Sequence, residues 1–131
     1  MSRSDRWSRV RRAFALLTLS LSFALTGCTI RLGDFTMMST KNVDLSRGAN
    51  FERGPNRIEG RDTIHIILFI PCGRPNIKDA VDRAIQSTPG GVALMDVVWR
   101  QEGWWIPFIY GQISYVAEGT PLVDPALVPK D

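Results

Sequence analysis

The sequence predicts a two-layer α+β domain, in which one amphipathic helix packs on a mainly antiparallel sheet of about four strands. Three observations support this. Residues 76–87 carry apolar side chains at helical spacing, residues 63–70 and 92–100 are dense in branched apolar residues typical of strands, and residues 104–120 contain two strand-like segments joined by a short connection. A helix with one apolar stripe and a sheet with apolar faces bury these surfaces against each other. The predicted order is strand, strand, helix, strand, strand.

The segment 1–27 predicts an export signal rather than part of the domain. Five arginines and one acid precede a charge-free apolar stretch over residues 13–25. That stretch is too short to span a bilayer core, which takes about 20 helical residues. A charged start followed by a short apolar segment is typical of a signal peptide. The pair Arg11-Arg12 leaves twin-arginine export open beside the general secretory route.

The end of this segment is more specific. Leu25-Thr26-Gly27-Cys28 resembles the lipobox of bacterial lipoprotein signal peptides. The resemblance implies cleavage between Gly27 and Cys28, and attachment of a diacylglycerol and a fatty acyl group such as palmitate to Cys28. Residue 29 is Thr rather than Asp, which by analogy with enteric bacteria indicates the periplasmic face of the outer membrane. We expect no cofactor besides these covalent lipids.

Removal of the signal changes the charge of the chain. The full sequence has 16 Lys and Arg against 13 Asp and Glu in 131 residues. Without the five arginines and one acid of the signal, residues 28–131 carry a side-chain charge of −1 with histidine neutral. Proteins that bind nucleic acid concentrate positive charge against the phosphates. We therefore expect no nucleic-acid partner, and the oligomeric state stays open.

Cys72 is the one thiol left once Cys28 is in a thioether. The mature chain then has no internal disulfide, and a domain of about 100 residues can fold on its core alone. A free cysteine packs as a small hydrophobe, which favours a buried Cys72, with a reactive thiol as the alternative.

The first half of the mature chain has weak patterns before one strong strand. We expect residues 28–33 to form a flexible lipidated tether, residues 34–40 a strand, and residues 41–56 a loop with several Gly and Asn. Residues 63–70 (TIHIILFI) place apolar side chains on both faces, which predicts a strand covered on both sides and ended by Pro71.

The predicted helix has both a cap and a stripe. Asn76 can accept a hydrogen bond from an N–H of the first turn. Lys78 and Asp82, and also Asp79 and Arg83, are spaced for ion pairs on the solvent side. The apolar stripe consists of Ile77, Ala80, Val81, Ala84 and Ile85.

Three extended segments follow the helix, over residues 92–100, 104–110 and 112–120. The last two are expected to form an antiparallel hairpin because their connection is short. Residues 121–131 contain three prolines and predict a flexible tail. These boundaries give a single domain over residues 34–120.

Candidates for catalysis lack the spacing that catalysis requires. His65 is the only histidine, and no second His or Cys lies at the spacing of a metal site. Cys72 and Asp79 follow it, but along an extended chain Cys72 would lie roughly 20 Å from His65. A nucleophile and its base need hydrogen-bond reach. Asp96 interrupts an apolar strand, and Arg100 is its expected ion-pair partner on the same face.

The aromatic segment over residues 104–110 is the main candidate for binding a partner. It contains Trp104, Trp105, Phe108 and Tyr110. Alternation along a strand places Trp104 and Trp105 on opposite faces, so both cannot face one core. Aromatic side chains outside the core often bind a partner or a membrane interface. The alternative is that the helix covers one face and a loop covers the other.

Four runs of sequence together resemble a group of small bacterial envelope lipoproteins of uncharacterised function. They are GCTIRLGDFTMMSTKNVDL from residue 27, IEGRDTIHIILFIPCGRPNIKDAVDRAI from residue 58, ALMDVVW from residue 93 and IPFIYGQISYVAEGT from residue 106. The resemblance implies a compact α+β domain in the cell envelope, and it supplies no catalytic residue.

The sequence thus predicts a lipid-anchored envelope protein that is not an enzyme and acts as an interaction or structural module, with an unknown envelope protein or lipid as its partner. A module that binds a small ligand or a lipid in an apolar cleft is the alternative. An enzyme would require a spatial cluster of Asp96, Glu59, Glu118 or His65, which sequence alone does not reveal.

Overall fold

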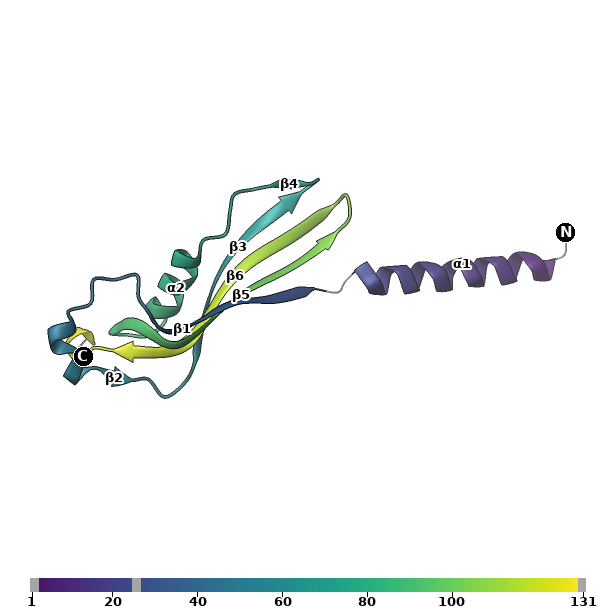
Figure 1. Ribbon diagram of the computed structural model, residues 1–131. Coiled ribbons are helices and arrows are strands. Elements are labelled where there is room, and N and C mark those ends of the chain that lie inside the picture. Colours follow the sequence, from purple (N-terminus) through teal and green to yellow (C-terminus); the bar gives the residue numbers. More distant parts are fainter. Residues whose placement is uncertain (1–2, 25–26, 130–131) are drawn as a thin grey trace.

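The computed structural model describes residues 3–24 and 27–129, which form two α-helices, six strands and two short 3-10 helices. The α-helices are α1 (Arg3–Ala24) and α2 (Ile77–Gln86), and the 3-10 helices are η1 (Leu45–Asn50) and η2 (Pro125–Leu127). The strands are β1 (Cys28–Met38), β2 (Glu52–Arg53), β3 (Ile58–Ile67), β4 (Ile70–Pro71), β5 (Gly91–Ile106) and β6 (Tyr110–Val123). Figure 1 shows α1 apart from the sheet and α2 against it.

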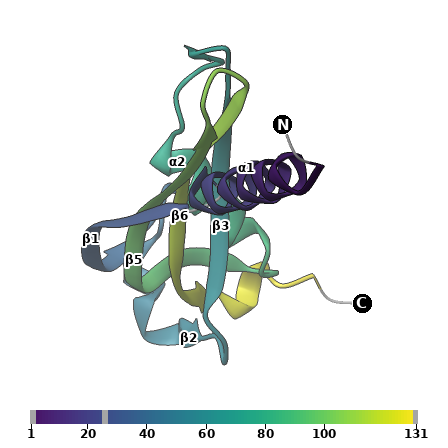
Figure 2. The same cartoon turned by 90° about the vertical axis from the view of Figure 1, so that its right-hand side faces the viewer.

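All pairs in the sheet are antiparallel, with the strand order β1-β5-β6-β3-β4. The short β2 pairs with the end of β6 that β3 leaves free. Figure 2 shows the four long strands side by side in this order. The α2 helix packs against β3, β5 and β6 on one side, which we name the helix face, and we name the opposite side the open face. The predicted α+β class with a mainly antiparallel sheet is confirmed, with β2 and β4 as additional two-residue strands.

The core lies where α2 crosses the sheet. Its buried apolar residues are Ala80, Val81, Ala84, Ile85, Leu94, Val97 and Ala117. The helix sits directly on Gly60 of β3, where an added Cβ would lie 2.5 Å from the Ala84 nitrogen and 2.8 Å from its Cβ. Both distances are far below van der Waals contact, so this close packing requires glycine at position 60.

Local sequence signals predicted the position of α2 correctly. Asn76 caps the helix by accepting a hydrogen bond of 2.9 Å from the Lys78 N–H, as predicted. The expected ion pair between Lys78 and Asp82 is present at 2.9 Å. Arg83 does not pair with Asp79 as expected, because Asp62 on the helix face of β3 lies opposite it and pairs with it at 2.9 Å.

The first strand corrects the prediction of a flexible tether over residues 28–33. β1 begins at Cys28 itself, which pairs with Gly103, and continues along β5 to Met38. β5 is long enough to pair with β6 on one edge and with all of β1 on the other. Residues 28–31 and Gly33 therefore pair with β5, and Leu32 lies at a register shift between them.

The strand predicted over residues 63–70 also differs from the one that the structure shows. β3 ends at Ile67, the chain reverses at Leu68 and Phe69, and β4 returns beside it. His65 and Ile67 are exposed, so the strand is not covered on both sides. The apolar run continues past the strand into a hairpin turn that faces solvent.

The predicted flexible tail is partly folded. β6 extends to Val123, and Pro121 and Asp124 are buried. Asp124 pairs with Arg47 at 2.9 Å, and its backbone N–H donates to the Gly90 carbonyl oxygen. The domain therefore continues through η2.

The helix α1 lies outside the core. All of its side chains that the structure describes are exposed, including Trp7, Phe14 and Leu16. Within residues 3–24 and 27–129, no helix has the length and apolar character needed to cross a membrane.

Candidate functional site

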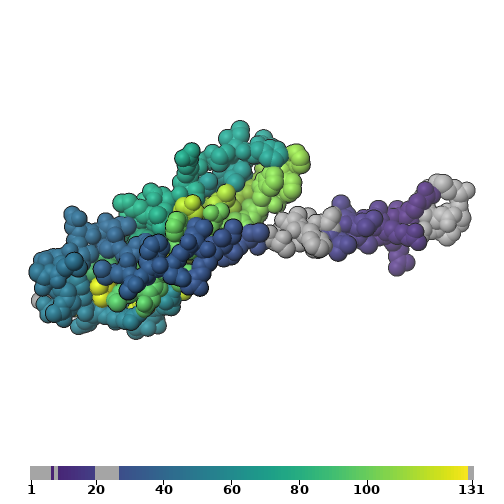
Figure 3. Space-filling view, in the orientation of Figure 1, coloured from purple at the N-terminus to yellow at the C-terminus, as the bar shows by residue number. Residues whose placement is uncertain are grey.

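Two hairpin turns meet at one end of the sheet and form an apolar surface. The Leu68 N–H donates to the Ile109 carbonyl oxygen at 3.4 Å, which joins the two turns. The Phe69 ring makes edge contacts with Trp105 and Phe108, with centroid separations of 5.3 and 5.0 Å. We name this surface the sheet tip, and it consists of Ile67, Leu68, Phe69, Ile70, Trp105, Phe108 and Ile109. Their exposed fractions range from 43% to 70%, and Figure 3 shows the teal and light-green turns side by side at this end.

The backbone of the sheet tip is strained. Leu68 and Phe69, the two central residues of the β3–β4 turn, have φ of 46° and 72°. Phe108 follows Pro107 in the β5–β6 turn and has φ of 64°. Turns with positive φ ordinarily use Gly, Asn or Asp at these positions, and other residues cost about 1–2 kcal/mol each in the left-handed region. The tip thus keeps large apolar side chains at a conformational cost.

The aromatic segment divides between two surfaces. Trp105 and Phe108 belong to the sheet tip, whereas Trp104 contacts the Tyr110 ring on the open face at a centroid distance of 5.5 Å. Tyr110 also stacks on His65 at 5.7 Å, and its hydroxyl accepts a hydrogen bond of 2.8 Å from Gln112. The predicted opposition of Trp104 and Trp105 is confirmed.

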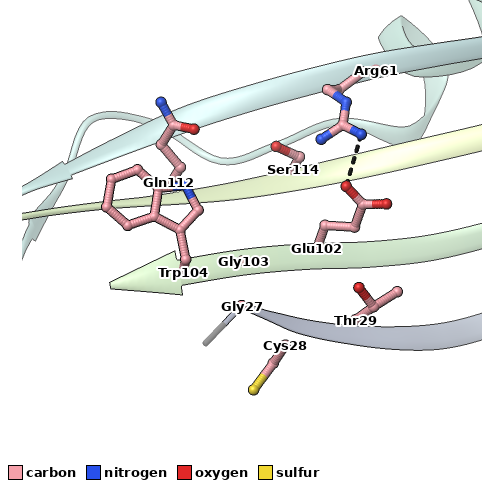
Figure 4. Close-up of a pocket in the computed structure, with 9 residues that line it drawn as sticks. All are labelled: Gly27, Cys28, Thr29, Arg61, Glu102, Gly103, Trp104, Gln112 and Ser114. Carbon is pink, nitrogen blue, oxygen red and sulfur yellow. Dashed lines mark ion pairs between the residues drawn. The ribbon is translucent and has the colours of Figure 1, made fainter. Parts of the chain in front are cut away.

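Cys28 lies at the same end of the sheet as the tip. It pairs with Gly103, two residues before Trp105, and it is exposed. Figure 4 shows its sulfur pointing away from the ion pair of Arg61 and Glu102. On that side a shallow depression of about 370 Å³ is lined by Cys28, Ile66, Gly103, Trp104, Trp105, Gln112 and Ile113. A mostly apolar surface therefore leads from the Cys28 thiol towards the tip.

Farther from the tip, the open face carries a network of ion pairs. Arg100 is its centre and contacts Glu59 at 2.5 Å, Glu102 at 2.8 Å and Glu118 at 2.6 Å. We name this set the arginine–glutamate network, and it consists of Arg57, Arg61, Arg100, Glu59, Glu102 and Glu118. Its three positive and three negative charges cancel.

The network favours the ionised state of Glu102 and Glu118. The hydrogen bond from Arg57, followed by that from Arg100, lowers the pKa of Glu118 below its ordinary value. The hydrogen bond from Arg100 lowers the pKa of Glu102 as well, against partial burial that acts in the opposite direction. The same contacts raise the pKa of Arg100. A general acid requires the reverse shift of a carboxyl pKa.

Acid should weaken the domain through this network. Because the pKa values of folded Glu102 and Glu118 lie below the ordinary 4.5, their stabilising contribution is present well above pH 4.5. It is lost as the pH falls from there through the folded pKa values. We expect the free energy of unfolding from urea titration to fall between about pH 6 and pH 3. Glu118→Gln should make that dependence shallower, and an unchanged slope would contradict this assignment.

A second depression borders the network beside Cys28. It measures about 200 Å³ and is lined by Gly27, Cys28, Thr29, Arg61, Glu102, Gly103, Trp104, Gln112 and Ser114 (Figure 4). Pockets for small ligands usually measure about 300–1,000 Å³ and enclose most of the ligand. This depression is smaller and open, and the Arg61–Glu102 ion pair across it is already satisfied.

The β3–β4 hairpin corrects the predicted distance between His65 and Cys72. Because the chain reverses at Leu68, the Cys72 N–H donates to the His65 carbonyl oxygen at 2.8 Å. Cys72 is also exposed, contrary to the favoured burial. The His65 Nδ1 is hydrogen-bonded to the Tyr110 hydroxyl. Among the described residues, no hydrogen bond or ion pair joins Asp79 to this pair.

The other acids considered for catalysis lie in separate settings. Asp96 sits at a register shift in β5 with φ of 52°, which turns it away from Arg100, and its carboxylate pairs with Arg53 instead. The predicted pair with Arg100 is therefore wrong. Glu59 and Glu118 do meet, but both are bound by Arg100. The candidate carboxylates and His65 do not form one cluster.

Sequence reasoning missed most of the sheet tip and the whole network. The sequence signal that could have indicated the tip is the absence of charge, since residues 63–73 and 103–117 contain no Asp, Glu, Lys or Arg.

Over the ranges 3–24 and 27–129, no group of three or more His, Cys, Asp or Glu could hold a metal ion. No family model, curated protein or solved structure matches the chain, so the resemblance to envelope lipoproteins stays a prediction.

Proposed function

We propose that the chain is a lipid-anchored protein of the bacterial envelope and acts as a non-enzymatic interaction module. The observation that carries this proposal is the position of Cys28. It is the first residue of β1, it is exposed, and it follows the lipobox residues Leu25-Thr26-Gly27. Acylation of its sulfur therefore needs no rearrangement of the domain.

The helix before Cys28 supports the same proposal. The described side chains of α1 are exposed, and none belongs to the core of the domain. Cleavage before Cys28 would therefore remove an apolar segment and leave the core intact. Thr29, in place of Asp, supports the outer membrane as the destination.

The charged groups of the open face support a non-enzymatic role. The carboxylates of the arginine–glutamate network are already bound by arginines, and the pKa values of Glu102 and Glu118 are lowered. A catalytic acid or base requires a pKa near the working pH and access to substrate. We assign the network to stability, and the aromatic segment with Trp104, Trp105, Phe108 and Tyr110 to binding an envelope protein or lipid.

Labelling with radioactive palmitate tests the anchor. The wild-type chain, produced in a Gram-negative host, should take up label and be recovered at the mass of the processed form. Cys28→Ala should abolish both the label and the processing, since Cys72, the other cysteine, does not follow a lipobox. Cys72→Ala is the matched control, because Cys72 is the second exposed cysteine and should retain full labelling. Label that persists in Cys28→Ala would refute the anchor.

A further inference from the structure

The polarity of the sheet changes in three steps towards its tip. The arginine–glutamate network comes first, and Glu102 and Asp62 are the last charged residues of β5 and β3 before the tip. Trp104, Tyr110 and His65 follow on the open face, held by ring contacts. The sheet tip itself is apolar. The order of ion pairs, then Trp and Tyr, then aliphatic and Phe side chains is the order found across a membrane–water interface.

The proposed anchor at Cys28 would place the sheet tip next to a membrane leaflet. Ile106, the last residue of β5, lies three residues beyond Gly103, the partner of Cys28. This spacing corresponds to about 10 Å along the strand. Amphipathic helices that lie in a membrane interface bury their apolar face by about 5–10 Å at the boundary between headgroups and acyl chains. The tip therefore projects beyond the anchor residue by the depth that such an interfacial contact requires.

The surface between the anchor and the tip is compatible with lipid. The depression beside Cys28 is lined on the way to the tip by Ile66, Trp105 and Ile113. Residues 63–73 and 103–113, which form this end of the sheet, carry no Asp, Glu, Lys or Arg that would have to lose its hydration.

The turn residues provide an independent argument. Leu68, Phe69 and Phe108 hold positive φ angles that Gly or Asn would adopt with less strain. Strain of this kind concentrates at functional sites. Large apolar side chains at these positions do not help the chain to turn, so we attribute their presence to the surface that they contact.

We propose that the sheet tip inserts into the phospholipid leaflet that holds the Cys28 anchor, with Trp104 and Tyr110 at the level of the headgroups. The proposal deepens the proposed function and rests on it, since the anchor sets the distance between the domain and the leaflet. It names phospholipid as the envelope component that the aromatic segment binds. Two points of contact, the acyl chains and the tip, give the domain one orientation on the membrane.

Photo-crosslinking of the full chain in a Gram-negative host tests the insertion. Phe108→p-benzoylphenylalanine places the probe at the tip, where the native side chain is 70% exposed, and the matched control Leu127→p-benzoylphenylalanine places it in η2, where Leu127 is 57% exposed. Figure 1 shows η2, beside the C-terminus, at the other end of the domain. Radioactive phosphate marks phospholipids but not the acyl groups on Cys28, and radioactive palmitate in a parallel culture marks the anchor.

We expect light-dependent phosphate label on the chain with the probe at position 108 and background label with the probe at position 127. The insertion would be overturned if the palmitate-labelled chain with the probe at position 108 carried no more phosphate label than the control with the probe at position 127. It would also be overturned if the probe at position 108 formed a protein adduct instead of a lipid adduct. Either result would leave the anchor intact. A chain without palmitate would instead refute the anchor, and with it the geometry on which the insertion rests.

A second variant separates insertion from folding. Leu68→Asn with Phe69→Gly removes apolar side chains from the tip and supplies residues that suit positive φ. We expect this chain to keep wild-type protease resistance and to lose most of the phosphate label from the probe at position 108. Full label in this folded variant would count against the proposal, because Phe108 would then reach lipid without the rest of the tip.

Discussion

Gly60→Ala should destabilise the domain by about 3 kcal/mol or more, the largest effect that we expect from a single methyl group in this protein. The new Cβ would lie 2.5 Å from the Ala84 nitrogen and closer still to the Ala80 carbonyl oxygen. These atoms belong to the backbone of α2, so a change of rotamer cannot relieve the clash. The helix would have to move away from β3, which would open the core around Val81 and Ile85.

Urea unfolding followed by circular dichroism measures this effect. Gly48→Ala is the matched control, because no heavy atom lies within 4 Å of its added Cβ. A change of this kind on the surface usually stays within about 0.5 kcal/mol. Equal stability of the two variants would show that α2 does not sit on Gly60 at the distance described.

Arg100→Met should cost about 2 kcal/mol, which for a domain of this size lowers the melting temperature by roughly 10 °C. Arg100 is the only network residue that contacts all three glutamates, and its side chain is 20% exposed. Its loss leaves three carboxylates near two arginines. The repulsion that results should raise the pKa values of Glu102 and Glu118 towards 4.5.

Two further variants identify the cause. Arg100→Lys keeps the charge but cannot contact several carboxylates with one planar group, so its melting temperature should fall between wild type and Arg100→Met. Adding Glu102→Gln to Arg100→Met should recover part of the loss by removing one unpaired charge. Additive losses in this double variant would mean that Arg100 and Glu102 contribute independently.

Short-range patterns predicted the helix because its signals are local. The Asn76 cap and the apolar stripe of α2 are contained within about three turns of chain, and both are present as expected. The opposition of Trp104 and Trp105 likewise follows from strand alternation alone. Features of this kind need no knowledge of which segments meet in space.

The missed features depend on pairing between distant segments. The β3–β4 turn at Leu68 and Phe69 lacks the usual turn residues, so the apolar pattern of TIHIILFI runs through it without interruption. The strand at residues 28–33 exists because β5 offers it an edge. Glu59 and Arg61, like Arg100 and Glu102, alternate at the period of one strand face, but the register that brings them together is set by β6.

Under the proposed anchoring, the start of β1 at Cys28 also limits how far from the membrane the domain can act. A lipoprotein on a long flexible leader can search the width of the periplasm, whereas Cys28, the proposed site of acylation, is itself the first residue of β1. From the level of Gly103 to the far end of β5 at Gly91, the sheet extends about 40 Å. With Cys28 acylated, the module acts only in the layer next to its leaflet, and any partner must approach within that distance.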